Sequence, residues 1–477
     1  MNADAHAAPR IARRDFLRIA SFSAASMAVP SLFCGCDSLR ARAAQRTDKP
    51  NIVFILADDL GYGDLGCYGR QDIKTPVIDG IAAEGVRFTQ YYSNGPECSP
   101  TRTAFMTGRY QQRVGGLECA IGTGNVGRYD DAIRLRQTND LGLPVEETSI
   151  ARMVKDAGYA TAVTGKWHLG YEPKFAPHLH GFDHAFYCIG GGMDYFHYLD
   201  TVAGYNLFLN GKPVSRKGHF TDLATDEAVK FIDKHADEPF FLYVPYTAPH
   251  SPFQGPDDAQ PDPLPLDSPL WNQGKAPPDV YIAMIEHMDR SIGRILKTLD
   301  KHGLTENTVV IFGSDNGGTA SARNAPLSRI KGSTFEGGIR VPVMARWPGV
   351  IPQGLVSDQV CITMDFSASI VRIAGATVPP GREFDGLDIL RLVETGQPPR
   401  KRALFWRARR GDRTWRAVRD GDMKYIRRTD AGQSEEYLFD LKKDIGEARN
   451  LLADRPKEAR RLAALLADWE TQVQHAR

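Results

Sequence analysis

The chain has 477 residues, 42% of them hydrophobic and 25% charged, with a formal net charge of +1. These values are ordinary for a globular protein long enough to bury a large core in one or two domains, and a near-neutral charge predicts no nucleic-acid partner. The five cysteines beyond residue 43 are scattered and odd in number, which excludes a disulfide framework.

The first 43 residues are predicted to be an export signal (1–43) rather than part of the fold. Arg13 and Arg14 begin a motif that resembles a twin-arginine signal. The small apolar run that follows, 19–33, is too short and too rich in Ser and Ala for a membrane span. Cleavage near residue 43 would leave a periplasmic or extracellular protein, delivered by the twin-arginine export machinery. The alternative is a lipid anchor on Cys36, which follows a poor lipobox.

The run of residues 51–57 is apolar and rich in β-formers, as in a central parallel strand buried on both faces. Asp58 and Asp59 follow it directly. Two adjacent acids at the end of a buried strand are costly unless a positive group pairs them. The same edge of an open α/β sheet gathers ligands. The pair is therefore either a solvated turn or two carboxylates that bind a divalent cation.

The segment that begins at Cys98 is predicted to form a helix. Pro100 can open a helix, and Gly108 can end it. Cys98 would lie at the positive end of the helix dipole, with Arg102 pointing back from the first turn. Such a place suits a nucleophile that handles an anion; the alternative is a structural cysteine ahead of an ordinary helix. Residues 110–148, rich in Gly and charge, are predicted to be a long surface loop.

Two further strands end on candidate catalytic residues. The strand predicted at 159–164 leads to Lys166 and His168, which on an extended chain face the same side. A cation beside an imidazole can hold an oxyanion and move a proton. The buried strand at 239–246 brings His250 to its end. Taken alone, Lys166 and His168 would be interpreted as solvent-exposed surface residues, and His250 as a structural histidine in a loop.

The strand predicted at 308–314 ends on Asp315 and Asn316. An acid and a carboxamide supply the hard oxygen donors that calcium or magnesium prefers. Lys331 opens a Gly-rich segment further along the chain. No set of cysteines and histidines with the spacing of a zinc site accompanies these residues.

Beyond residue 398 the pattern changes to short antiparallel strands with polar turns, followed by a charged helix near 456–475. The sequence therefore predicts an α/β fold in which a large mixed, mainly parallel sheet is sandwiched by helices. We expect a catalytic domain at 50–397 and a smaller C-terminal subdomain of antiparallel strands and a helix at 398–477.

The run Cys98-Xaa-Pro-Xaa-Arg102, followed by Thr-Gly-Arg at 107–109, resembles the signature of the type I sulfatases. These are the formylglycine-dependent branch of the alkaline phosphatase superfamily. The segment 331–342 closely resembles a second signature of that family. Thr101 departs from the pattern, because this position is most often serine. The resemblance extends from about residue 50 onward, points to the arylsulfatase A and N-acetylgalactosamine-6-sulfatase group, and implies an alkaline-phosphatase-like fold.

The resemblance implies hydrolysis of an aryl or carbohydrate sulfate monoester. A separate formylglycine-generating enzyme would oxidise Cys98 to formylglycine (3-oxoalanine), whose hydrated aldehyde is the nucleophile. The implied ligands of one calcium ion are Asp58, Asp59, modified Cys98, Asp315 and Asn316. The implied catalytic residues are Cys98, Arg102, Lys166, His168, His250 and Lys331.

The implied roles divide between charge and proton transfer. Arg102, Lys166 and Lys331 would hold the sulfate oxygens, where charge develops in the transition state. His250 would protonate the leaving alcohol, with help from Lys331, and His168 would take a proton from the second hydroxyl of the nucleophile. The alternatives are a phosphodiesterase or phosphonate monoester hydrolase of the same superfamily, or a catalytically silent glycan-binding homologue. Substrate choice would fall to loops near 110–148, 188–220 and 254–278.

Overall fold

The computed structural model describes residues 49–122, 130–201, 203–271 and 276–474. The predicted export signal at 1–43, with Cys36, lies outside these ranges. Within them, no helix is both long and apolar enough to cross a membrane.

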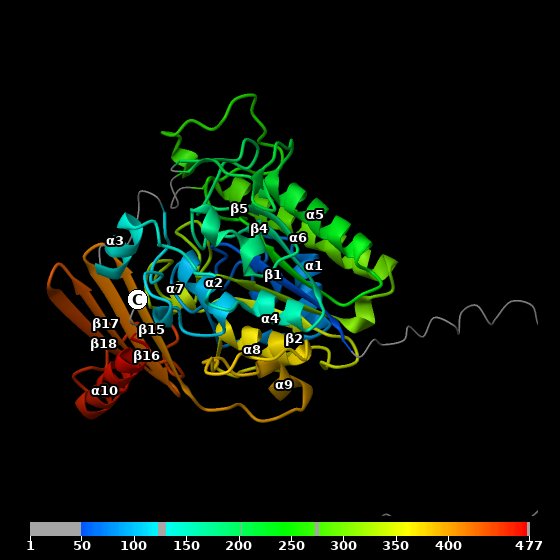
Figure 1. Cartoon of the computed structure of the whole chain (residues 1–477). Helices are drawn as coiled ribbons and strands as arrows, with labels where there is room; N and C mark the ends of the chain where they lie inside the picture. The colour runs from blue at the N-terminus through cyan, green and yellow to red at the C-terminus, as the bar shows by residue number, and fades with distance from the viewer. Residues whose placement is uncertain (1–48, 123–129, 202, 272–275, 475–477) are drawn as a thin grey trace, which may run out of the picture. The chain divides into compact units, whose positions relative to one another are not determined.

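A large mixed sheet forms the centre of the fold (Figure 1). Its strand order is β13-β2-β12-β11-β1-β10-β4-β5-β8-β9. The five strands from β11 to β5 run parallel, whereas β12, β8 and β9 are antiparallel to their neighbours. The strands are β1 (Asn51–Ala57), β2 (Val86–Phe88), β4 (Ala160–Lys166), β5 (His184–Cys188), β8 (Phe208–Leu209), β9 (Lys212–Pro213), β10 (Phe240–Pro245), β11 (Thr308–Ser314), β12 (Val343–Arg346) and β13 (Leu355–Ser357). The predicted mixed, mainly parallel sheet is confirmed.

Helices cover both faces of this sheet, because its central strands are apolar on both sides (Figure 1). In β1, Phe54 packs into one core and Val53 into the other. The helices on the Phe54 side are α2 (Cys98–Thr107), α4 (Ile150–Asp156), α8 (Met364–Ile373) and α9 (Ile389–Glu394). Those on the Val53 side are α1 (Pro76–Ala83), α5 (Phe220–Lys234) and α6 (Pro278–Lys301).

A second sheet, at the C-terminal end of the chain, is an antiparallel meander. It consists of β15 (Ala403–Arg410), β16 (Arg413–Asp420), β17 (Met423–Asp430) and β18 (Gln433–Asp440), and α10 (Pro456–Gln472) packs on it. Gly411, Gly421 and Gly432 take positive φ in the three tight turns. Because these turns are tight, the strands extend right up to them and are longer than the apolar runs in the sequence predicted. The predicted four strands and final helix are confirmed, while the domain boundary at residue 398 stays a prediction.

The predicted surface loop at 110–148 is wrong in its first part, which is buried. The chain there forms a short 3-10 helix, Gln111–Arg113, and later the helix α3 (Asp130–Gln137). Gln112 donates from Nε2 to the backbone oxygen of Arg407 at 2.8 Å, and Glu118 accepts two hydrogen bonds of 2.8 Å from the Arg407 guanidinium. Polar residues can be buried here because β15 supplies their partners.

Candidate active site

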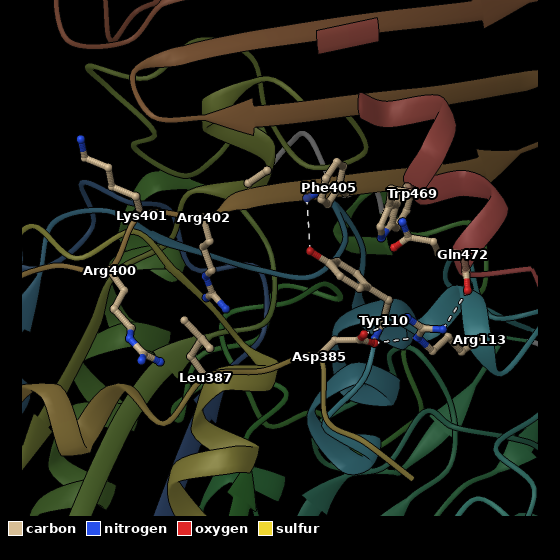
Figure 2. Close-up of a pocket in the computed structure, with 11 residues that line it drawn as sticks. Tyr110, Arg113, Asp385, Leu387, Arg400, Lys401, Arg402, Phe405, Trp469 and Gln472 are labelled. Atoms are coloured by element: carbon tan, nitrogen blue, oxygen red, sulfur yellow. Dashed lines mark hydrogen bonds and ion pairs between the residues drawn. The ribbon is translucent and has the colours of Figure 1, made fainter. Parts of the chain in front are cut away.

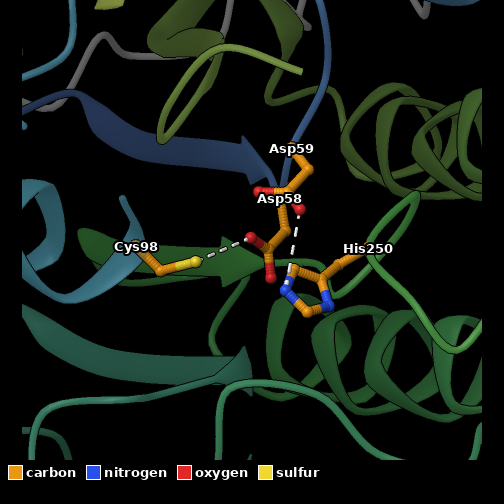
Figure 3. Close-up of side chains that lie close together, drawn as sticks. All are labelled: Asp58, Asp59, Cys98 and His250. Carbon is orange, nitrogen blue, oxygen red and sulfur yellow. Dashed lines mark hydrogen bonds and ion pairs between the residues drawn. The ribbon is translucent and has the colours of Figure 1, made fainter. Parts of the chain in front are cut away.

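The carboxyl ends of four parallel strands bring the predicted site residues together. Asp58 and Asp59 follow β1, Lys166 ends β4, and β10 leads into the loop that carries His250. Asp315 and Asn316 follow β11. The N-terminus of α2 lies at the same edge, so Cys98 lies close to Asp58, Asp59 and His250 (Figure 3). One ligand atom from each of Asp58, Asp59, Cys98 and His250 lies within 4.8 Å of all the others.

The Cys98 side chain is buried among charged groups. Its thiol donates to Asp58 Oδ1 at 3.2 Å, and the Nζ atoms of Lys166 and Lys331 lie 3.3 and 3.7 Å from Sγ. Burial, together with the Asp58 carboxylate, raises the pKa of the Cys98 thiol well above its ordinary value. An unmodified Cys98 is therefore a neutral thiol and a poor nucleophile at neutral pH.

Two site residues have left-handed backbones. Asp59 has φ 67° and His168 has φ 55°. Adjacent side chains on an extended strand point to opposite faces, so the turn at Asp59 is what lets both carboxylates enter the site. Non-glycine residues in this region cost about 1–3 kcal/mol and cluster at active sites. The predicted extended path from Lys166 to His168 is wrong at His168, although His168 still lines the pocket around Cys98.

Each acid of the site is paired with a cation. Lys331 Nζ lies 2.7 Å from Asp59 Oδ1, and Lys166 Nζ contacts Asp58. Arg102 donates from Nε and Nη2 to Asp315 Oδ2 at 3.1 and 2.8 Å, so positive charge is held at the base of the pocket.

Burial and these ion pairs set the protonation of the acids. Burial alone would raise the pKa of Asp59, but Lys331 and His250 outweigh it and hold that pKa at about 2. Burial and the neighbouring Asp58 charge raise the pKa of Asp315 to about 6. Burial opposes the charge on Lys331, yet Asp59 keeps its pKa above the ordinary value. Asp59 and Lys331 are therefore both charged at neutral pH.

The oxygen donors at this edge fit a hard divalent cation. Asn316 donates from Nδ2 to Asp59 Oδ1 at 2.7 Å, while its Oδ1 atom is buried and has no hydrogen-bond partner in the part of the chain that the structure describes. An orphaned buried carbonyl beside three carboxylates is an arrangement that a cation stabilises. The residues that fit this role are Asp58, Asp59, Asp315 and Asn316.

Two histidines line the pocket in neutral form. Burial is the main cause and the Lys331 charge the second in lowering the pKa of His250 to about 3. Burial and then the Lys166 charge lower the pKa of His168 well below its ordinary value. His250 Nδ1 lies 2.5 Å from the backbone oxygen of Ser251 and donates to it, so the ring proton is on Nδ1, while Nε2 lies 3.6 Å from Asp59 Oδ2. His168 Nε2 lies 2.6 Å from the backbone oxygen of Ile121.

The pocket above Cys98 has a volume of about 530 Å³. Tyr171 and Trp271 give it aromatic walls, and Arg410 reaches it from β15. Sequence reasoning missed Arg410 and its partner Glu97, since no motif connects positions so far apart in the chain. The one available signal was Glu97, an acid directly before Cys98. A carboxylate at the start of a buried helix requires a cation as its partner.

Two family models match the chain. The model described as Sulfatase matches residues 50–376. The model described as N-sulphoglucosamine sulphohydrolase, C-terminal, matches residues 331–474. Together they span both sheets.

Named proteins and a solved structure are similar over most of the chain. N-acetylgalactosamine-6-sulfatase from Mus musculus is 34% identical over 80% of this chain and 74% of its own length. Steryl-sulfatase from Homo sapiens is 31% identical over 72% of this chain and 70% of its own length. The crystal structure of Ps i-CgsB in complex with k-i-k-neocarrahexaose is 31% identical, with a TM-score of 0.76, over 88% of this chain and 92% of that one. Its agreement supports the fold described above.

Proposed function

Because this chain belongs to the sulfatase family of sulfuric ester hydrolases, we propose that it hydrolyses a carbohydrate sulfate monoester to an alcohol and inorganic sulfate. The similarity to N-acetylgalactosamine-6-sulfatases and to a complex with a neocarrahexaose supports a saccharide substrate. The single observation that carries the proposal is the position of Cys98, within 3.7 Å of two ammonium groups at the base of a pocket.

Two groups supplied to the chain complete the proposed chemistry. Formylglycine at position 98 would supply, as its hydrate, a nucleophilic hydroxyl and a second hydroxyl for release of sulfate. One calcium ion on Asp58, Asp59, Asp315 and Asn316 would supply a Lewis acid for the sulfate oxygens. The buried oxygen donors of Asp58, Asp59, Asp315 and Asn316 support calcium rather than zinc.

The cations of the chain would bind the sulfate. Lys331 lines the pocket, and Lys166 lies against Cys98, so both can donate to sulfate oxygens where charge grows in the transition state. Arg102 was predicted to share this role. Its Nε and Nη2 donate to Asp315, and its Nη1 donates to the backbone oxygen of Lys166 at 2.9 Å. We therefore assign Arg102 to holding Asp315 and Lys166 in place.

The histidines would handle protons at the two ends of the reacting bond. His250 is neutral in the free chain, with its proton on Nδ1, so Nε2 would have to take up a second proton from solvent beside the bound sulfate anion before delivering it to the leaving alcohol, and the Lys331 ammonium would assist there. His168 would accept a proton from the side of residue 98. Its Nε2–H donates to the backbone oxygen of Ile121, so the lone pair of Nδ1, which is buried and has no hydrogen-bond partner among the described residues, would accept this proton.

Sulfate release by Cys98→Ala tests the proposal directly. We expect turnover to fall by several orders of magnitude, because the variant loses the nucleophile and keeps its fold. Cys361→Ala serves as a control, since Cys361 is also buried and has no place in the site. Undiminished sulfate release by Cys98→Ala would remove Cys98 from the mechanism.

Two rival functions have their own measurements. Kinetics on matched aryl sulfate and aryl phosphodiester substrates separate a sulfatase from a phosphodiesterase or phosphonate monoester hydrolase. Intact mass of the peptide that contains Cys98, from the native host, separates an active enzyme from a silent glycan-binding homologue. An unmodified thiol in that peptide would support the silent homologue.

Maturation and export complete the proposal. We propose that a formylglycine-generating enzyme modifies Cys98, and that residues 1–43 direct the chain to the periplasm or the exterior through the twin-arginine machinery. Fractionation of cells that express Arg13→Lys/Arg14→Lys tests export. Retention of this variant in the cytoplasm is the expected result, and normal export would contradict it.

A further inference from the structure

A second cavity lies beyond the C-terminal end of α2, whereas Cys98 begins that helix. Figure 2 shows the residues that line this cavity. It has a volume of about 440 Å³ and shares no lining residue with the pocket around Cys98. Tyr110 and Arg113, which follow α2, line it together with residues of the C-terminal part of the chain. Because α2 has 10 residues, its two ends are separated by about 15 Å. The second cavity is therefore remote from the proposed chemistry.

The lining of this cavity is strongly basic. Its charged residues are one acid, Asp385, and four bases: Arg113, Arg400, Lys401 and Arg402. Arg113 forms two hydrogen bonds with Asp385, at 2.8 and 2.9 Å, and Arg402 is paired with Asp365. Arg400 and Lys401 are exposed, and neither has a carboxylate partner within the described ranges. Two uncompensated positive charges thus remain, and they favour an anionic ligand.

Two buried donors of the lining lack acceptors. Trp469 is 4% exposed, and its Nε1–H has no hydrogen-bond partner among the described residues. The Nε–H of Arg402 is also buried and unpartnered in this part of the chain. Buried donors in native proteins are normally satisfied, by protein, water or ligand. Both residues line the cavity, so an oxygen acceptor that enters it can satisfy them.

Aromatic rings provide the remaining surface. Phe405 and Trp469 stack with centroids 5.2 Å apart and an interplanar angle of 5°, and Tyr110 packs edge-on against Trp469 at 5.1 Å. In Figure 2, Arg400, Lys401 and Arg402 lie on one side of the cavity and Trp469 on the other. A ligand that carries oxygens and has apolar surface matches this combination better than a bare anion does.

We propose that this cavity binds a sulfated segment of a saccharide chain, as a remote site that holds the polymer while another of its residues occupies the Cys98 pocket. This inference rests on the proposed function, which supplies the chemistry of the chain. Attachment at a second point raises the effective concentration of sulfate ester at the active site. The remote site therefore contributes to the binding of polymers, and it contributes nothing to the binding of a single sugar in the Cys98 pocket.

Binding to the full chain carrying Cys98→Ala tests this site without turnover. The probes are dextran sulfate and unsulfated dextran of matched length, measured by isothermal titration calorimetry. In that background, Arg400→Gln/Lys401→Gln should bind dextran sulfate about tenfold more weakly, because charged hydrogen bonds are lost. Trp469→Phe, which keeps an aromatic side chain and removes the indole N–H, should weaken binding severalfold. Unsulfated dextran should bind no variant measurably.

The matched control is Lys442→Gln/Lys443→Gln, which removes two adjacent exposed charges outside the cavity. If this control pair weakened dextran sulfate binding equally, the binding would reflect general charge attraction and the proposed site would be overturned. Unchanged binding by Arg400→Gln/Lys401→Gln would also overturn it. In the enzyme with native Cys98, the ratio of KM for dextran sulfate to KM for an aryl sulfate should rise about tenfold in the cavity variant. Calorimetry measures binding without hydrolysis. The test of the remote site can therefore fail while the test of sulfate release succeeds, and the reverse is also possible.

Discussion

Arg410, the last residue of β15, donates two hydrogen bonds to Glu97, the residue directly before Cys98. Nε lies 2.8 Å from Oε1, and Nη2 lies 2.9 Å from Oε2. The Glu97 carboxylate also accepts from the backbone N–H of Ala120 at 2.6 Å. The C-terminal sheet thus supplies the countercharge for a buried acid at the start of α2, and it takes part in building the pocket.

Replacing Arg410 should destabilise the chain through Glu97. Arg410→Ala leaves the buried Glu97 carboxylate with one backbone donor, so we expect the free energy of unfolding to fall by about 1–3 kcal/mol. Urea denaturation measures this change. The control is Arg413→Ala, in which an exposed ion pair with Asp430 is lost, and its effect should stay below about 1 kcal/mol. Equal effects of the two variants would contradict the special role of the Arg410–Glu97 pair.

A buried lysine joins the C-terminal sheet to the segment that follows Lys331. Lys424 Nζ lies 2.7 Å from Glu336 Oε1 and 2.9 Å from Glu447 Oε1. Lys424→Met leaves two carboxylates buried together, so the free energy of unfolding should fall by about 3–5 kcal/mol. The exposed Lys442→Met should change it by less than about 0.5 kcal/mol. Thermal and urea unfolding check both values, and similar stabilities would contradict the prediction.

Calcium binding should depend on the orphaned amide oxygen of Asn316. A chelator should abolish sulfate release, and added calcium should restore it. Asn316→Ala removes one oxygen donor and the bond to Asp59, so the dissociation constant for calcium should rise at least about tenfold. Calorimetry on the purified chain gives this constant without an activity assay. An unchanged constant would mean that the ion binds elsewhere.

A buried histidine should make stability fall in mild acid. Burial, followed by Arg152, lowers the pKa of His180 to about 4, against about 6.5 in an unfolded chain. Between these values the unfolded chain binds more protons, so the free energy of unfolding decreases as pH falls from 6.5 to 4. His180→Phe should make this slope shallower, because one such group is removed. Equal slopes from denaturation at several pH values would contradict the assignment.

The sequence predicted the strands and their ends because the signals are local. Unbroken apolar runs, as at β1 and β11, indicate strands buried on both faces, and the polar residues directly after them must lie at one edge of the sheet. Glycine marked the end of α2 for the same local reason, since Gly108 takes φ 68° there.

The features that sequence reasoning missed depend on partners far along the chain. Gln112 and Glu118 look like surface residues until Arg407 is placed beside them. Histidine takes the left-handed backbone conformation of His168 more often than most residues do, but too rarely for the sequence to predict it at this position. The family resemblance predicted the residues of the candidate site, whereas the pairing of Arg410 with Glu97 required the folded chain.

The burial of Cys98 sets an order of events in the life of the protein. Every residue of α2 is buried in the folded chain, and the side chains around Cys98 come from strands as distant as β11. The proposed modifying enzyme would therefore have to bind the peptide around residue 98 while the sheet is incomplete. Under that proposal, the interval between synthesis of the peptide and closure of the sheet would limit how many molecules become active, so variants that fold faster should carry more unconverted thiol.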